Sequence, residues 1–414
     1  MPPGTWVFFE VMSKNLLLQL HVESCAFGGD GVAHHEGRVI FVPGTLPGET
    51  VIAEIVSEKN DFSRARVHRI ENPSPDRIAP LCPLAGICPG CHYLHASPEA
   101  ETRCKATQFA AFLETAGGPP DRLDEPLLPG TPLGYRNKMV LHVNKESGTP
   151  QVGYVGADMQ SVTPVSHCLL ANDAINADLA AKLADPGFFH SIHHRMKLTW
   201  RHTERNGVIF FRNQPPKRAS WLREKLRFGE ISVPAGGFFQ INPAGAQSLV
   251  DEFTAVLREH PVKRVIDLYC GAGLFAAAAA AAGVPEVMGA ETDADAVNAA
   301  RYNLKQYGQP EAHLLADDAA RALPELLRDA PEHTLLAVDP PRAGLSGTMR
   351  RSLLAQPPGR LIVYISCHPA TWARDAAALR RGGCRLLRAR LINQFCRTGH
   401  FEIFSLFRRE NDHA

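Results

Sequence analysis

The C-terminal part of the chain sets the strongest limit on its fold. From about residue 262, short apolar runs alternate with longer helix-like segments. The predicted strands are residues 264–267, 286–290, 313–315, 334–339 and 360–366, and the clearest predicted helices are 274–282 and 293–307. Strands that alternate with helices favour a Rossmann-like, doubly wound parallel sheet with helices on both faces. Two final strands, 386–391 and 401–407, predict an antiparallel pair at the end of the sheet.

The N-terminal segment predicts a different architecture. Its short predicted strands are residues 16–22, 38–42, 51–56 and 64–70, and its Gly- and Pro-rich turns are 28–31, 43–44 and 47–48. Short strands at this spacing suggest a small barrel of the OB type. Such barrels often hold single-stranded nucleic acid, although a purely structural β-domain fits the same pattern.

The length of 414 residues corresponds to two to four domains. We predict an OB-like barrel over residues 1–72, a mixed α+β central domain over 73–235 and the α/β domain over 236–414. The strand-like text begins just after Met12, so translation starts at either Met1 or Met12. A Pro-containing linker is expected between the barrel and the central domain.

Basic and acidic side chains nearly balance over the whole chain, 44 against 43, for a net charge of +1. The charged side chains are nevertheless distributed unevenly along the chain. Residues 191–230 carry ten basic and three acidic side chains, whereas 261–340 carry six and twelve. A local net charge of +7 suits the phosphate backbone of a nucleic acid, although a solvated basic face has the same composition. No window is long and apolar enough to predict a membrane span.

Ten cysteines need an explanation in a chain that shows no secretory leader. A cytoplasmic protein keeps its thiols reduced, so clustered cysteines are read as metal ligands or catalytic groups. Cys82, Cys88 and Cys91 share one Pro- and Gly-rich loop, and Cys168 lies in a second loop. Four thiolates suit either tetrahedral zinc or a [4Fe–4S] cluster, and the spacing does not separate the two. Cys104, in a predicted helix, is a rival fourth ligand.

A Gly-x-Gly turn follows the first strand of the α/β region. Gly271 and Gly273 allow a ligand to approach the backbone closely. Glu291 ends the next strand, where a carboxylate suits the hydroxyls of a ribose. The loop lacks the third glycine of a dinucleotide site, so S-adenosylmethionine (SAM) fits better than NAD, which is the alternative. Asp318 closes the third strand and is placed to bond an adenine amino group, with Asp317 as its competitor.

Three further strand ends carry reactive groups. Asp339 begins an Asp-Pro-Pro run at the sheet edge where ligands bind. Cys367 lies before a predicted helix, whose N-terminus is expected to lower the pKa of the thiol and make it a nucleophile. Glu402 lies between two apolar residues, and burial there raises the pKa of a carboxyl toward that of a useful base. Taken one at a time, Asp339 fits a rigid turn, Cys367 a buried thiol and Glu402 a surface carboxylate. Together the three groups indicate catalysis.

The combined motifs resemble the SAM-dependent RNA (uracil-5-)-methyltransferases, most closely the branch that modifies large-subunit ribosomal RNA. Residues 44–49 are similar to the TRAM barrel of that family, an RNA-binding module. The resemblance implies a [4Fe–4S] cluster on Cys82, Cys88, Cys91 and Cys168. It implies SAM-site positions at Gln240, Tyr269, Leu274, Glu291, Asp318 and Asp339, beside the loop glycines Gly271 and Gly273. Leu274 would act through its backbone, and His368 stands where the family usually has Asn.

The resemblance also implies a reaction, the transfer of a methyl group from SAM to C5 of a uridine. Cys367 would add to uracil C6, Glu402 would remove the C5 proton, and Asp339 would orient the uracil. The implied partner is RNA, specifically 23S rRNA, with no DNA or membrane partner, and a monomer is expected. Three alternatives remain: a tRNA uridine methyltransferase, a non-catalytic RNA-binding metalloprotein, and a redox enzyme using the cluster and NAD.

Overall fold

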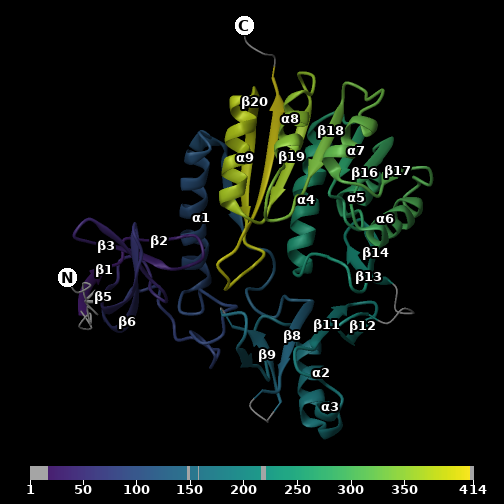
Figure 1. Ribbon diagram of the computed structural model, residues 1–414. Coiled ribbons are helices and arrows are strands. Elements are labelled where there is room, and N and C mark those ends of the chain that lie inside the picture. Colours follow the sequence, from purple (N-terminus) through teal and green to yellow (C-terminus); the bar gives the residue numbers. More distant parts are fainter. Residues whose placement is uncertain (1–16, 147–149, 157, 216–220, 411–414) are drawn as a thin grey trace, which may run out of the picture.

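The computed structural model describes residues 17–410 except 147–149, 157 and 216–220. Both proposed start sites, Met1 and Met12, lie outside the described residues, as does the first residue of the predicted strand 16–22. Figure 1 shows a small β domain at the N-terminal end, a central sheet region and a large α/β region. Among the helices that the structure describes, none combines the length and the apolarity that crossing a bilayer requires.

The N-terminal domain is a curved sheet of six short strands. These are β1 Leu17–His21, β2 Ser24–Cys25, β3 Gly31–His35, β4 Arg38–Val42, β5 Thr50–Glu58 and β6 Phe62–Asn72, in the order β1-β5-β6-β4-β3-β2. Its core is formed by alternating side chains that are almost fully buried, among them Leu20, Ile40 and Val51. The sequence missed β2 and β3, because β2 has two residues and β3 ends in two histidines.

The central region contains a five-stranded sheet, two helices and a hairpin. The strands are β8 Lys138–Asn144, β9 Gln151–Val155, β10 Val162–Pro164, β11 Lys197–Thr203 and β12 Gly207–Arg212, in the order β10-β9-β8-β11-β12. The helices are α2 Asp173–Ala184 and α3 Pro186–His190. The hairpin, β13 Trp221–Leu226 with β14 Gly229–Pro234, packs its buried side chains into the core of the α/β region. Buried Trp200 and Leu141 are part of the core between this sheet and α2.

The α/β region is built on an eight-stranded sheet in the order β17-β16-β15-β18-β19-β21-β20-β7. The strands are β7 Leu123–Leu127, β15 Arg264–Leu268, β16 Glu286–Ala290, β17 His313–Leu315, β18 Thr334–Val338, β19 Leu361–Ser366, β20 Cys384–Ile392 and β21 Glu402–Arg409. Strands β15 to β19 are parallel, and β20 and β21 form an antiparallel pair. The predicted doubly wound sheet and its antiparallel pair are confirmed.

Helices cover both faces of this sheet. The helices α4 Pro243–Glu259, α5 Leu274–Ala281 and α6 Ala294–Gln306 belong to one core, and α7 Ala319–Leu326, α8 Gly347–Leu354, α9 Pro369–Arg381 and α1 Pro98–Thr115 belong to the other. Both α1 and β7, which is preceded by the short 3₁₀ turn Pro120–Arg122, lie inside the predicted central segment 73–235. They nevertheless pack on the eight-stranded sheet, so the central segment is interwoven with the α/β region.

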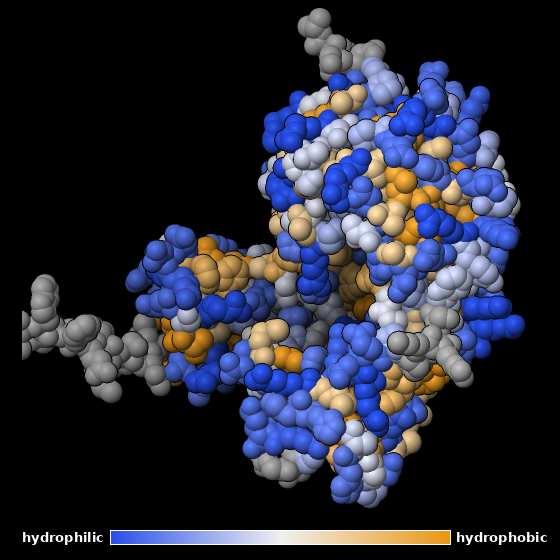
Figure 2. All heavy atoms as spheres, turned by 45° about the vertical axis from the view of Figure 1, so that its right-hand side comes forward, coloured by the Kyte–Doolittle hydropathy of each residue, from blue (hydrophilic) through white to orange (hydrophobic). Residues whose placement is uncertain are grey.

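The three parts of the chain meet below the carboxyl ends of the parallel strands (Figure 1). Figure 2 shows that the molecular surface is hollowed at this junction. The ring of Phe27, in the turn between β2 and β3, packs 5.5 Å from His368, 5.9 Å from His400 and 5.8 Å from Phe401, measured between ring centroids. The N-terminal domain therefore touches the residues beside both predicted catalytic groups, Cys367 and Glu402.

Candidate active site

The predicted ligand loop lies where the strand order of the sheet reverses, between β15 and β18. Tyr269, Gly271 and Gly273 all have positive φ angles, of 63°, 52° and 82°. A Cβ atom on Gly273 would lie 3.0 Å from the Cβ of Ala300, so this position also brings α5 and α6 close together. The Gly271 amide donates to Glu291 Oε2 at 3.1 Å. The structure thus joins the loop to the predicted ribose carboxylate.

The start of α5 is fixed by a buried carboxyl group. Asp267 Oδ2 accepts from the Ala276 amide at 2.9 Å, and Asp267 Oδ1 has no partner among the described residues. Burial raises the pKa of Asp267 to about 8. Leu274, the first residue of α5, is nearly buried, so its side chain belongs to the core. Any contact of Leu274 with a ligand would therefore be made by its backbone.

Asp318 and Asp317 both bind the first turn of α7, Asp318 through backbone amides and Asp317 through a side chain. Asp318 is the N-cap of α7 and accepts from the Ala320 amide at 3.0 Å and the Arg321 amide at 3.2 Å. Asp317 pairs with the Arg321 guanidinium at 2.6 Å. Burial raises the pKa of Tyr269 to about 12, and nearby Asp318 adds to that rise. Tyr269 and Asp318 are therefore neighbours, as the predicted site requires.

Cys367 and Glu402 are brought together by the register of two antiparallel strands. In the pairing of β19 with β21, Ser366 lies opposite Ile403. Continuing that register by one residue places Cys367 opposite Glu402. Asp339 follows the last residue of β18, which pairs with β19 on the other side. The three predicted catalytic side chains thus come from three adjacent strand ends.

The pKa of Cys367 differs from the one that the sequence predicted. Burial, with added repulsion from Glu402 and Asp339, raises the pKa of Cys367 to about 12. The expectation of a lowered thiol pKa at the start of α9 was wrong, because burial and two nearby carboxyls outweigh the helix terminus. Burial also raises the pKa of Asp339 to about 7 and that of Glu402 well above its usual range. Arg342 is the cation that opposes both the Cys367 and the Glu402 shifts.

His368 takes over a capping role beside Cys367. It is the N-cap of α9, and its Nδ1 accepts from the Thr371 amide at 3.4 Å. Burial and Arg342 lower the pKa of His368, so the ring is neutral near pH 7 and one nitrogen remains an acceptor. An Asn side chain caps a helix in the same way. The departure from the usual Asn therefore leaves the helix start intact.

The four proposed metal ligands line one small cavity. Cys82, Cys88 and Cys91 approach it from the Cys-rich loop and Cys168 from the loop that precedes α2. In the part of the chain that the structure describes, no three His, Cys, Asp or Glu side chains are arranged to hold a metal ion. The structure therefore gathers the four cysteines without presenting a formed metal centre.

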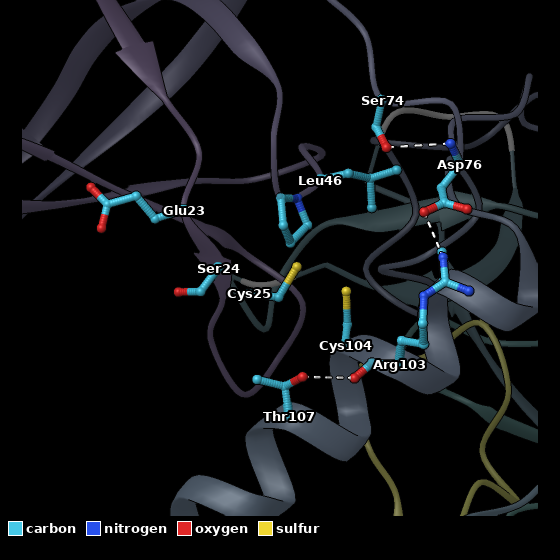
Figure 3. A pocket seen from close by; sticks show the side chains of 11 residues that line it. Glu23, Ser24, Cys25, Leu46, Ser74, Asp76, Arg103, Cys104 and Thr107 are labelled. Carbon is cyan, nitrogen blue, oxygen red and sulfur yellow. Dashed lines mark hydrogen bonds and ion pairs between the residues drawn. The ribbon is translucent and has the colours of Figure 1, made fainter.

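The rival ligand Cys104 lies in a different place. It lines a separate pocket, with about 730 Å³ of empty space, between the N-terminal domain and α1. Figure 3 shows its sulfur turned toward that of Cys25 of β2. Cys104 does not line the cavity of the four cysteines. This geometry favours Cys168 as the fourth member of the group.

Sequence reasoning missed three residues around the site. Gln394 bonds to both Gln240 and Glu402, with distances of 3.2 and 2.7 Å. Arg342 directly follows the Asp-Pro-Pro run. That position was a usable signal, because a cation lowers the pKa of carboxyl groups near it. Phe27 carried no such signal, because its contacts join segments more than 300 residues apart.

Comparison with known proteins supports the arrangement. The family model described as tRNA (uracil-5-)-methyltransferase matches residues 225–410, and the TRAM domain model matches residues 18–68. The 23S rRNA (uracil(1939)-C(5))-methyltransferase RlmD of Acidithiobacillus ferrooxidans is 30% identical, over 94% of this chain and 97% of that protein. The chain belongs to the RNA (uracil-5-)-methyltransferase family. Its N-terminal domain is therefore a TRAM domain, and the enzyme is a SAM-dependent methyltransferase.

Two further RNA uracil-5 methyltransferases are similar to this protein over most of its chain. The protein of the same name from Yersinia enterocolitica is 28% identical over 92% of this chain and 93% of its own length. The Pyrococcus abyssi tRNA (uracil-54, C5)-methyltransferase, solved in complex with S-adenosyl-L-homocysteine, has a TM-score of 0.72. It covers 94% of this chain and 100% of its own at 20% identity, which shows that the two share a fold.

Proposed function

We propose that this enzyme methylates C5 of one uridine in 23S rRNA through a covalent adduct on Cys367. The observation that carries the proposal is the strand register that sets Cys367 opposite Glu402, with Asp339 at the next strand end. The relatives that match nearly the whole chain are named as 23S rRNA enzymes, which favours ribosomal RNA over tRNA. That substrate also places the enzyme in the cytoplasm, where the thiols that it requires stay reduced.

The roles of the three side chains follow from the chemistry of uracil. C5 becomes nucleophilic only after the Cys367 sulfur has added to C6, which leaves an enolate. C5 then takes the methyl group and S-adenosylhomocysteine departs. Glu402 accepts the C5 proton, and elimination restores the double bond and the free thiolate. Asp339 orients the uracil edge. A paired uridine is not accessible to these groups, so the base is presented flipped out or from a loop.

The thiol of Cys367 must lose its proton before it can attack. Its surroundings in the free enzyme disfavour the thiolate, because burial and two carboxyls raise the pKa of Cys367 to about 12. Arg342 acts in the opposite direction. A sulfonium cation bound beside these carboxyls would add further positive charge and favour the thiolate. We therefore expect the nucleophile to be activated only when the methyl donor is bound.

We propose that the methyl donor lies along the loop at the strand reversal. Glu291 would bond the ribose hydroxyls, and Asp318 would bond the adenine amino group. The backbone at Gly271 and Gly273 would lie against the ligand. The remaining contacts would come from Gln240, Tyr269, the backbone of Leu274, and Asp339. The side chain of Gln240 is buried, and the first residues of α5 are buried as well. Both observations support a SAM site that is formed before the ligand binds.

We further propose that the four cysteines hold a [4Fe–4S] cluster. The support is the guanidinium of Arg136, whose Nε is buried and has no hydrogen-bond partner among the described residues. Arg136 acts on Cys88 and Cys91 as a nearby cation that lowers their pKa values against the rise caused by burial. A buried cation beside Cys88, Cys91 and Cys168 fits an anionic centre bound by thiolates. Bound there, the cluster would join the Cys-rich loop to the loop that carries Cys168.

Changing Cys91 to alanine is expected to remove iron and sulfide from the protein, because a four-thiolate centre rarely tolerates loss of a ligand. Anaerobically purified wild-type enzyme should contain about four iron and four sulfide per chain. Colorimetric iron and sulfide assays check both numbers. Cys104→Ala is the matched control and should keep its iron. Stoichiometric zinc in the wild type, or equal iron in both variants, would contradict the assignment.

The substrate is tested by incubating the enzyme with labelled SAM and either 23S rRNA from a strain lacking the gene or unmodified tRNA. Label should enter 23S rRNA, and mass spectrometry of its fragments should locate 5-methyluridine at one position. Preferential labelling of tRNA would favour the tRNA alternative. Absence of label in both would favour a non-catalytic RNA-binding protein.

A further inference from the structure

Gln394 occupies a central place in the active site that the reaction scheme leaves without a role. It lies between β20 and β21 and is fully buried. Its Nε2 donates to Glu402 Oε2 at 2.7 Å and to Gln240 Oε1 at 3.2 Å. Both hydrogens of one amide are therefore used, one on the proposed base and one on a residue of the proposed SAM site.

The orientation of this amide is determined by its surroundings. Turning the amide over would place Gln394 Oε1 against Oε2 of the ionised Glu402 carboxylate, with no hydrogen between them. The ionised carboxylate therefore selects the orientation in which the Gln394 amide donates to it. The backbone carbonyl of Gln394 also accepts from Asn242 Nδ2 at 2.9 Å, so the main chain is held as well.

The oxygen atom of the Gln394 amide is in an unfavourable environment. Gln394 Oε1 is buried, and no described residue donates a hydrogen bond to it. It lies against Gly245 in the first turn of α4, where a Cβ atom would be only 2.2 Å away. A buried acceptor without a partner destabilises a fold. An arrangement of this kind is typical of a functional site, where local stability is given up for geometry.

We infer that Gln394 is a positioning residue for the general base, holding one oxygen of the Glu402 carboxylate so that the other faces the reacting carbon. The inference rests on the proposed function of Glu402. The amide bonds Oε2 and leaves Oε1 free to accept the C5 proton. The bonded oxygen remains an acceptor after that proton has been taken, so the amide need not turn during the reaction.

The same hydrogen bond sets the charge of the base. Burial and Asp339 raise the pKa of Glu402, whereas Gln394 and Arg342 lower it. Only the ionised carboxylate can remove a proton, so every donor that stabilises it increases the active fraction. Loss of the Gln394 amide would raise the pKa of Glu402 further. The enzyme would then need a higher pH to release its product.

The inference is tested with Gln394→Met, which keeps the length of the side chain and removes its donors. Single-turnover reactions with target RNA and SAM follow the covalent RNA–protein adduct on denaturing gels from pH 6 to 9. We expect the adduct to form at close to the wild-type rate and to break down about 10- to 100-fold more slowly at pH 7, the loss typical of a hydrogen bond to a charged group. The rate of breakdown should rise at a higher pH than in the wild type.

A second variant tests the same geometry without removing the amide. In Gly245→Ala the new methyl group would lie 2.2 Å from Gln394 Oε1 and 2.5 Å from its Cβ, so it would displace the whole Gln394 side chain, while alanine suits the helix at that position better than glycine does. Gly245→Ala should therefore show the same slow breakdown and the same shift with pH. Gln356→Met is the structural control, since Gln356 is also buried but donates to the backbone carbonyl of Ser352 on α8. It should leave breakdown unchanged.

Each outcome has a distinct meaning. Wild-type breakdown and an unshifted pH profile in Gln394→Met would overturn the inference while leaving the proposed function intact. Equal slowing of adduct formation and breakdown, with the same slowing in Gln356→Met, would show a structural role only and would also overturn it. A wild-type enzyme that never forms an adduct would remove the proposed function, and the inference with it.

Discussion

Replacing Cys367 with alanine is expected to abolish both methyl transfer and the covalent RNA adduct. Without the sulfur, C5 of uracil stays a poor nucleophile toward the methyl group of SAM, and no other described thiol lies at this strand end. Loss of a nucleophile of this kind typically lowers turnover by at least about 10⁴-fold. The measurement is incorporation of labelled methyl groups into 23S rRNA, together with the amount of RNA retained on denatured protein.

The control for this prediction is Cys384→Ala. Cys384 is also a buried thiol of the α/β region, but it pairs with Arg409 at the opposite end of β21 from Glu402. Its removal tests whether losing any buried thiol from the sheet harms activity. We expect Cys384→Ala to form adduct and methylate RNA as the wild type does. A fully active Cys367→Ala enzyme would exclude the covalent mechanism.

Much of the α/β region could be predicted from its sequence, because its signals are local. Strands β15, β16 and β17 fall within one residue of their predicted bounds, since each is a short apolar run between helix or turn signals. Contributions from distant segments could not be predicted in this way. Edge strand β7 carries the polar sequence Leu-Asp-Glu-Pro-Leu and is recruited to the sheet only by pairing with β20.

The candidate site shows the same division between local and distant causes. Parallel strands end at one edge of a sheet, so the sequence was sufficient to expect Glu291, Asp339 and Cys367 near one another. The direction of the Cys367 pKa shift was not predictable, because it depends on burial by distant segments and on carboxyls contributed by other strands. Gln394 was missed for a similar reason. Its role becomes visible only when Glu402 and Gln240, 162 positions apart in the chain, are seen on the same amide.

Replacing Glu402 with glutamine is expected to stop the reaction after the methyl group has been transferred. At that stage C5 carries both the new methyl group and its original hydrogen, and Cys367 can leave only when that hydrogen is removed as a proton. A carboxamide has nearly the same shape as the carboxylate but cannot accept the proton. Turnover should fall by about 10²- to 10⁴-fold, the usual contribution of a general base. The methylated adduct should accumulate to nearly one per active site.

The decisive measurement is the mass of the RNA fragment attached to the protein in Glu402→Gln. A fragment that is heavier by one methyl group places the block after transfer, as the mechanism requires, whereas an unmethylated fragment would assign Glu402 to an earlier step. Glu325→Gln, which changes a half-exposed carboxylate paired with His313, should turn over normally. Full turnover by Glu402→Gln would exclude Glu402 as the base. The raised pKa of Glu402 would then reflect only burial and the neighbouring Asp339, as the raised pKa of Asp267 reflects burial with Asp339 and Glu291.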